Sequence, residues 1–337
     1  RDRWMVRGQA LWQITPDAKL RVIADYSDAD EQCCDAIVTV DPLGEAGIYA
    51  AVGLPANGGV SAFGPRALDS LTSNGEQFQN PFQQEGISAQ LDWNLGFADL
   101  VYIGSYRDFH AESIQHSEYV SLDVYAVGDN TAPFAAPSVR PSYDDIKTTT
   151  HELRLQGQAF NGRLDWLLGT YYSDEDIEER ATMTLGGDYG RYVSALLVPA
   201  LGAQAVSVGF GGNVPAALGG VDPAGSYADN KFNQQGESLS IFTHNVLELT
   251  DRLNLTVGLR YVEETKDGSF EQMSASSPAC ANIANGIVAN AYPANVAPLA
   301  PTALALTCFP FATEADLPAS AFLPLPRTFN DTFEDEE

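Results

Sequence analysis

The feature that most constrains this chain is a recurring pair of strands, each alternately apolar and polar, joined by a very short turn. Residues 238–264 form the clearest copy. One face of its second strand carries Leu253, Leu255, Val257, Leu259 and Tyr261, and the other carries Asn254, Thr256, Gly258, Arg260 and Glu264. This period of two is that of a β-strand. Segments of roughly 40 to 60 residues separate the pairs, far longer than connections in a compact soluble domain. Short turns at one end and long loops at the other are typical of an outer-membrane barrel wall.

The same pattern occurs in three earlier pairs. Their strands are expected at residues 3–14 and 20–28, 86–95 and 100–109, and 150–157 and 163–176. Together the four pairs predict about eight antiparallel strands of about ten residues, the length that a tilted membrane strand needs. Soluble strands are shorter, at about five or six residues. The sequence therefore predicts an all-β chain with short periplasmic turns and long extracellular loops.

One face of these strands is polar and carries charges of both signs: Arg7, Gln9, Asp92, Glu152, Arg154, Gln156, Arg260 and Glu264. A soluble β-sandwich, the main alternative, could bury such a face only at a high cost in free energy, whereas a hydrated or plugged lumen accepts it. Aromatic residues lie mostly toward the strand ends, as in interfacial girdles. They are Trp4, Trp12, Trp93, Tyr102, Tyr106, Trp166, Tyr172, Phe242 and Tyr261.

The chain is strongly acidic, with a net charge of -27 from 45 acidic and 18 basic residues. Because the basic residues are spread without clusters, nucleic acid is not an expected partner. The favoured interpretation of this acidity is that it keeps long exposed loops soluble, and the alternative is a specific attraction for cations. Residues 192–221 and 273–313 are long uncharged segments, but they contain Gly and Pro and show no helical period, so they are interpreted as loops.

Four cysteines allow disulfides in a chain that passes through an oxidising periplasm. Cys280 and Cys308 lie in one long segment and could close it. Cys33 and Cys34 are adjacent, and the sequence leaves open whether they bond each other or cysteines elsewhere.

Nothing in the sequence indicates catalysis, a cofactor or a structural metal. The histidines have no acid or nucleophile at a telling spacing, so the chain is not expected to be an enzyme. A metal-binding set of His110, His116, Glu112 and Glu118 is possible on composition, but surface residues of a loop are the favoured interpretation.

The strand pairs resemble wall segments of the TonB-dependent outer-membrane receptors, in the branch of the ferric-siderophore receptors. The resemblance is carried by THELRLQG with GRLDWLLGTYYSDEDIEE, by GESLSIFTHNVLELTDRLNLTVGLRYVEETKD, and by the two earlier pairs. It implies a barrel of about 22 strands around an N-terminal plug. It also implies a TonB box that contacts the inner-membrane TonB complex, and a place in the outer membrane of a Gram-negative bacterium in contact with its lipid.

On this interpretation residues 1–337 are a partial barrel domain without plug, TonB box or closing strand. A sheet of about eight such strands is expected to be curved and unclosed. The expected function is uptake of a scarce ligand, most of all a ferric siderophore. The alternatives are uptake of another nutrient, such as a glycan fragment or cobalamin, a passive porin or adhesive barrel, and a soluble secreted β protein.

Ligand capture in such a receptor would use loop tips and inward residues near the outer mouth, where aromatic and charged side chains suit chelate recognition. The candidates are Arg107, Asp108, Tyr119, Tyr125, Tyr171, Tyr189, Tyr192 and Glu264. Each of them could instead be a girdle or plug-contacting residue. Inward Glu152 and Arg154 are expected to contact a plug.

Overall fold

The computed structural model describes residues 2–31, 80–113, 115–116, 125–127, 142–186, 189, 227–275, 284–291, 294, 297–301 and 328–336. Nearly all of these residues belong to one antiparallel sheet, so the all-β, antiparallel prediction is confirmed. No helix within these ranges is long and apolar enough to cross a membrane.

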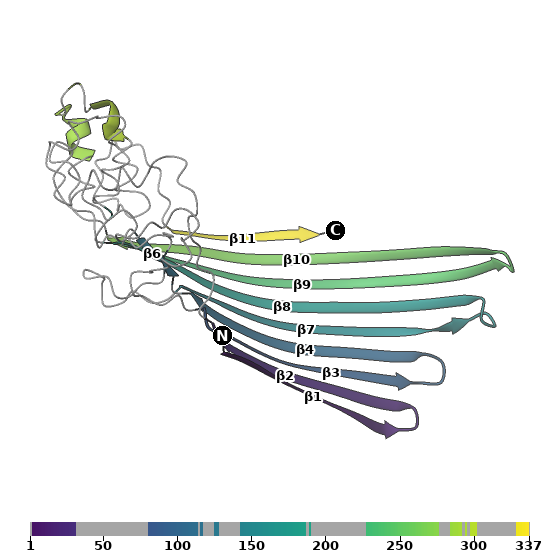
Figure 1. Ribbon diagram of the computed structural model, residues 1–337. Coiled ribbons are helices and arrows are strands. Elements are labelled where there is room, and N and C mark those ends of the chain that lie inside the picture. Colours follow the sequence, from purple (N-terminus) through teal and green to yellow (C-terminus); the bar gives the residue numbers. More distant parts are fainter. Residues whose placement is uncertain are drawn as a thin grey trace, which may run out of the picture.

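The sheet is built from long neighbouring strands in the order β1-β2-β3-β4-β7-β8-β9-β10-β11 (Figure 1). Their bounds are β1 (Asp2–Thr15), β2 (Ala18–Asp30), β3 (Phe82–Asn94), β4 (Asp99–Ser113), β7 (Ser142–Ala159), β8 (Leu164–Leu185), β9 (Tyr227–Thr250), β10 (Leu253–Ala275) and β11 (Thr328–Glu336). Two short strands, β5 (Gln115–His116) and β6 (Tyr125–Val127), pair with each other, and β6 also pairs with the far end of β8. A 3-10 helix, η4 (Ala297–Leu299), lies outside the sheet.

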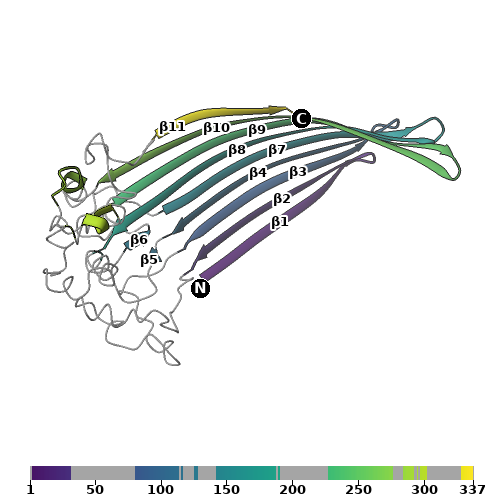
Figure 2. The same ribbon diagram turned by 90° about the horizontal axis from the view of Figure 1, so that it is seen from above.

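The sheet is curved and unclosed, as expected. Figure 2 shows β1 and β11 at opposite edges of the curve. Among the described strands, β1 pairs with β2 alone and β11 with β10 alone. Each edge therefore presents backbone groups that a closed barrel would pair with a further strand.

The structure corrects the predicted strand number and lengths. The eight expected strands are present, but β11 is a ninth long strand, formed by residues that belong to none of the four predicted pairs. The expected length of about ten residues is also wrong, because β1 to β4 have 13 to 15 residues, β7 has 18, and β8 to β10 have 22 to 24.

Register places the apolar residues of neighbouring strands on one face, which we call the banded face. Leu20 lies opposite both Trp12 and Leu91, and Leu91 lies opposite Tyr102, so the apolar rows continue from strand to strand. We define the apolar band by Val6, Ala10, Trp12, Leu20, Val22, Ala24, Ile87, Ala89, Leu91, Trp93, Leu100, Tyr102, Tyr106, Leu153, Leu155, Trp166, Leu168, Tyr172, Leu239, Ile241, Leu247, Leu255, Val257, Leu259 and Tyr261. Many of them are exposed, among them Leu259 at 70% and Trp12 at 62%.

The apolar band ends abruptly on the side of the long connections. Past the band, the banded face of each long strand from β1 to β10 carries a charged residue, and the first of these are Asp2, Asp28, Glu85, Asp108, Lys147, Asp174, Glu237 and Glu263; the short strands β5 and β6 contribute none. They are nearly in register, since Asp108 lies opposite both Glu85 and Lys147, and Asp174 lies opposite Glu237. We call this row the charged boundary. Strands β7 to β10 continue well beyond it, which explains their unexpected length.

Turns at the other end of the strands are tight. Between β7 and β8, Phe160, Asn161 and Gly162 all have positive φ angles, of 55°, 61° and 84°. Asn and Gly adopt this region readily, whereas Phe does so rarely, so the turn imposes it on Phe160. The turns fix the register and thus which residues share a face.

Candidate functional site

Aromatic residues border the apolar band on both sides. Trp12, Trp93 and Trp166 lie on the banded face near the tight turns. At the opposite border, Trp4, Tyr26, Tyr106, Tyr172 and Tyr261 each occupy the last position of that face before an acidic residue of the same strand. Phe242, expected in a girdle, instead lies on the other face, opposite Arg260. The remaining expected aromatics share the banded face.

The second face, which we call the polar face, carries the residues predicted to point inward. Its charges are mostly paired at the level of the apolar band. Arg107 Nη1 lies 3.4 Å from Asp25 Oδ2, and Lys19 Nζ lies 3.9 Å from Asp92 Oδ2. Exposed pairs of this kind contribute little stability, about 0 to 1 kcal/mol. Such a face is suited to water or a polar occupant.

Arg154 and Glu152 form the closest pair at this level. Arg154 Nε lies 2.9 Å from Glu152 Oε1, but Nε has no hydrogen-bond partner of suitable geometry in the described part of the chain. The pair is therefore an ion pair by distance, with hydrogen-bonding capacity left over. This arrangement agrees with the expectation that these two residues contact a further element, which stays a prediction.

Three of the predicted ligand-binding residues lie on the polar face, but the structure does not bring them together. Arg107 is in β4, Tyr171 in β8 and Glu264 in β10. Arg107 is engaged with Asp25, and the carboxylate of Glu264 lies 2.6 Å from Lys266 Nζ. The prediction of Asp108 as an inward residue is wrong, because Asp108 belongs to the banded face opposite Glu85. Adjacent residues of a strand point to opposite faces, so Arg107 and Asp108 cannot share one.

Tyr171 lines a groove of about 690 Å³ on the polar face. Glu152, Phe242 and Arg260 line it with Tyr171, and Arg260 Nη2 donates a hydrogen bond of 3.2 Å to Ser240 Oγ. The ring of Phe242 lies over Gly169, so close that a Cβ at that glycine would lie 2.3 Å from Phe242 Cζ. Gly169 thus leaves space for the ring of Phe242, which lines the groove.

The other predicted residues are distributed as follows. Tyr189, expected at an exposed loop tip, is buried, with 8% of its surface exposed. Tyr125 belongs to β6 and His116 to β5. Tyr119, Tyr192, Glu118 and the four cysteines, Cys33, Cys34, Cys280 and Cys308, lie outside the described residues.

His110, expected in or beside a loop, lies in β4 on the banded face beyond the charged boundary. Its Nδ1 lies 2.5 Å from Asp145 Oδ1, and its Nε2 lies 3.4 Å from Glu112 Oε1. Partial burial by itself lowers the pKa of His110, but the hydrogen bonds and negative charges of Asp145 and Glu112 outweigh it, so the pKa is raised overall. Within the described ranges, no group of three or more His, Cys, Asp or Glu side chains is arranged to hold a metal ion.

A second network beyond the boundary links β7, β8 and β9. Tyr143 donates a hydrogen bond to Glu178, which also lies 3.0 Å from Lys231 Nζ. Burial, and then the bond to Glu178, raise the pKa of Tyr143 to about 12. Arg180 and Asp229 form an ion pair that leaves only 11% and 4% of their side chains exposed. The strands are therefore held together by polar contacts where the apolar band has ended.

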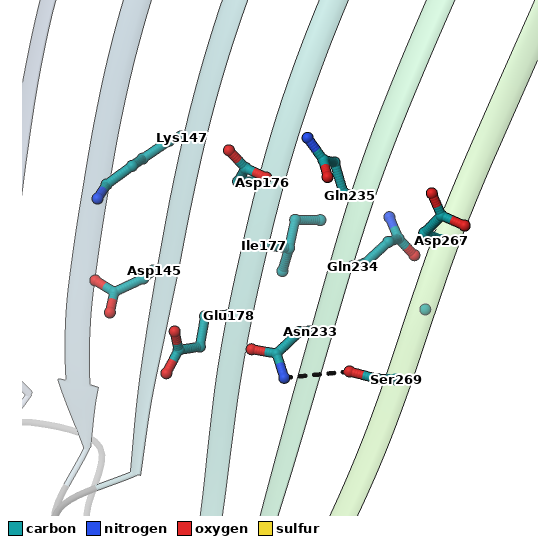
Figure 3. Close-up of a pocket in the computed structure, with 11 residues that line it drawn as sticks. Asp145, Lys147, Asp176, Ile177, Glu178, Asn233, Gln234, Gln235, Asp267 and Ser269 are labelled. Carbon is teal, nitrogen blue, oxygen red and sulfur yellow. Dashed lines mark hydrogen bonds between the residues drawn. The ribbon is translucent and has the colours of Figure 1, made fainter. Parts of the chain in front are cut away.

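Beside these networks lies a groove of about 480 Å³ on the banded face, shown in Figure 3. Two cross-strand rows form it, and we call them the engaged row and the open row. The engaged row consists of Asp145, Glu178, Asn233 and Ser269. The open row consists of Lys147, Asp176 and Gln235, one residue pair nearer the apolar band. Asp267 of β10 lies next to this row, opposite Gln235, and is not counted in it because it has an interaction of its own.

The two rows differ in their hydrogen bonding. In the engaged row, Asp145 contacts His110, Glu178 contacts Tyr143 and Lys231, and Asn233 Nδ2 donates a 3.3 Å bond to Ser269 Oγ. In the open row, all three side chains are exposed and none has a hydrogen-bond or ion partner among the described residues. Sequence reasoning missed this groove, because polar residues predominate on both faces of these strands and remove the alternation that would mark a face. Only pairing across strands brings the row together.

Comparison with models of protein families gave no match, and no curated protein matches the sequence. Among solved structures, the chain is similar to the ferric yersiniabactin uptake receptor FyuA from Yersinia pestis, with 9% identity and a TM-score of 0.45 over 77% of this chain. It is also similar to the siderophore receptor PiuA from Acinetobacter baumannii, with 13% identity and a TM-score of 0.45 over 82% of this chain. The matches cover 31% and 38% of those proteins, so the chain spans about a third of their length.

Proposed function

We propose that this chain is a section of the wall of an outer-membrane β-barrel that transports a ligand and does not catalyse a reaction. The observation that carries the proposal is the apolar band, exposed on one face of the sheet and ended by the charged boundary. Contiguous exposed apolar surface of more than a few hundred Å² is rare on soluble monomers. Lipid contact accounts for it.

The height of the band fits a membrane. From Leu253 to Tyr261 the banded face of β10 has five apolar positions without interruption. Eight steps of about 3.4 Å give about 27 Å along the strand. With a strand tilt of about 40°, this corresponds to about 21 Å along the membrane normal, close to the apolar band of about 25 Å in outer-membrane barrels.

The polar face is then the lumen side, and the transported ligand is proposed to be a ferric siderophore. This assignment rests on the resemblance of the strand pairs to wall segments of ferric-siderophore receptors. It includes a plug within the barrel and energisation by the TonB complex, with outer-membrane lipid around the wall. The groove of Tyr171, Phe242 and Arg260 lies on the face that such a plug or ligand would meet.

Uptake of a radio-iron siderophore by iron-limited cells expressing the full-length protein tests this proposal. Uptake is expected to require both the protein and a functional TonB complex in the host. Uptake that persists without TonB would indicate a passive porin. TonB-dependent growth on a glycan or cobalamin, without response to iron, would replace the siderophore by another nutrient.

A further inference from the structure

We propose that the open row of Lys147, Asp176 and Gln235 binds the sugar headgroup of a glycolipid in the membrane leaflet around the barrel. This inference rests on the proposed function, because it requires that the apolar band contacts lipid. The row lies on the same face as the band, so lipid headgroups that lie above the acyl chains beside the barrel contact these side chains.

The distance of the open row from the apolar band favours a headgroup larger than a phosphate group. In β8 the apolar band ends at Tyr172, and Asp176 follows four residues later. Four residues span about 13 Å of strand, or about 10 Å along the membrane normal at a tilt of about 40°. The headgroup layer of a phospholipid bilayer is only about 5 to 8 Å thick on each side. A compact phosphate headgroup therefore ends below the row, whereas one or two sugar rings extend to it.

The negative charge of the groove also favours a sugar headgroup over a phosphate headgroup. The groove is lined by four carboxylates, from Asp145, Asp176, Glu178 and Asp267, and by the ammonium of Lys147, and a second ammonium, that of Lys231, lies 3.0 Å from Glu178, so negative charge remains in excess. A phosphate group would be repelled by this excess of negative charge. Sugar hydroxyls are uncharged and can both donate and accept hydrogen bonds.

The side chains of the open row can form hydrogen bonds with sugar hydroxyls. Lys147 can only donate hydrogen bonds, ionised Asp176 can only accept them, and the amide of Gln235 does both. Neighbouring strands are about 4.8 Å apart, close to the separation of hydroxyls on alternate carbons of a sugar ring, so the three side chains can each meet a different hydroxyl. Since none of them is engaged within the described part of the chain, binding breaks no existing bond there. The engaged row behind them stays fixed by its own contacts.

The test uses the full-length protein in nanodiscs that contain phosphatidylcholine with either a digalactosyl diacylglycerol or phosphatidylglycerol. Lipids retained by the protein are identified by native mass spectrometry. We expect preferential retention of the digalactosyl lipid, and a loss of at least fivefold in that preference in D176A and in Q235A. The matched control E179A removes a carboxylate from the opposite face of β8 and should retain the preference.

Preferential retention of phosphatidylglycerol, equal retention of both lipids, or an unchanged preference in D176A and Q235A would overturn the inference. So would retention of soluble digalactose as strong as that of the lipid, because the site would then bind free sugar. Failure of the protein to insert into nanodiscs at all would instead refute the proposed function. Circular dichroism of each variant in the nanodisc shows whether its strands are intact.

Discussion

A positive charge placed in the apolar band should destabilise the protein in proportion to its depth. Val257 occupies the middle of the five apolar positions of β10, and Tyr261 occupies the last of them before Glu263. Both side chains are 46% exposed, so in water V257R and Y261R would have similar and small effects. In a membrane, arginine costs about 2 to 4 kcal/mol at the midplane and about 0 to 1 kcal/mol near the interface.

The expected difference between the two variants is therefore about 1 to 4 kcal/mol in the free energy of unfolding. At 1.4 kcal/mol for each factor of ten, this shifts the folding equilibrium by about five-fold to several hundred-fold. T256R provides the matched control, because Thr256 is exposed on the polar face next to Val257 and should tolerate arginine. Val257→Leu controls for the loss of the valine itself.

The measurement is reversible urea unfolding of the full-length protein from phospholipid vesicles, followed by tryptophan fluorescence. The change in midpoint, at an unchanged m-value, gives the change in stability. Equal effects of V257R and Y261R, or a larger effect of T256R than of V257R, would refute the assignment of the banded face to lipid.

Three further results are expected. H110Q should remove a stabilising contribution that is full below about pH 6.5 and lost as the pH rises through the raised pKa of His110, so the two proteins should differ in unfolding midpoint at pH 5.5 and converge at high pH. G169A should lower the free energy of unfolding by about 1 to 3 kcal/mol, because the added Cβ would clash with the ring of Phe242. In an F242A background the same substitution should have little effect, and additive effects in this double-mutant cycle would contradict the packing. D229A should cost about 3 to 5 kcal/mol in urea unfolding because it leaves the guanidinium of Arg180 buried without its carboxylate, and a loss below about 1 kcal/mol would show that the pair is hydrated.

The position of the strands within the band could be predicted because alternation survives wherever one face is apolar. Leu91 and Trp93 fall between Gln90, Asp92 and Asn94, so their strand and their shared face follow from sequence alone. Beyond the charged boundary both faces are mostly polar, as from Ser173 to Glu179 with Ile177 as the one apolar residue, and the pattern no longer distinguishes a strand from a loop. Backbone pairing continues there without it, which is why the strand ends and β11 were missed.

The sequence could not show which of the predicted ligand residues lie near one another, for a related reason. Residue type and nearness to a strand end do not report which strands lie side by side. Arg107 and Glu264 lie on the same face, yet β7, β8 and β9 separate them. Residues distant in sequence meet only where the register aligns them, as Asp176 and Gln235 do.

The sequence by itself determined the strand periodicity, the two faces of the sheet and the apolar band, because side-chain alternation is a local property of an extended backbone. The tertiary structure decided how far each strand continues, that the band ends in one charged row, and that an open polar row lies just beyond it. These depend on pairing between residues as far apart in the sequence as Leu164 and Leu247, and such pairing follows from register across the whole sheet and not from any one segment.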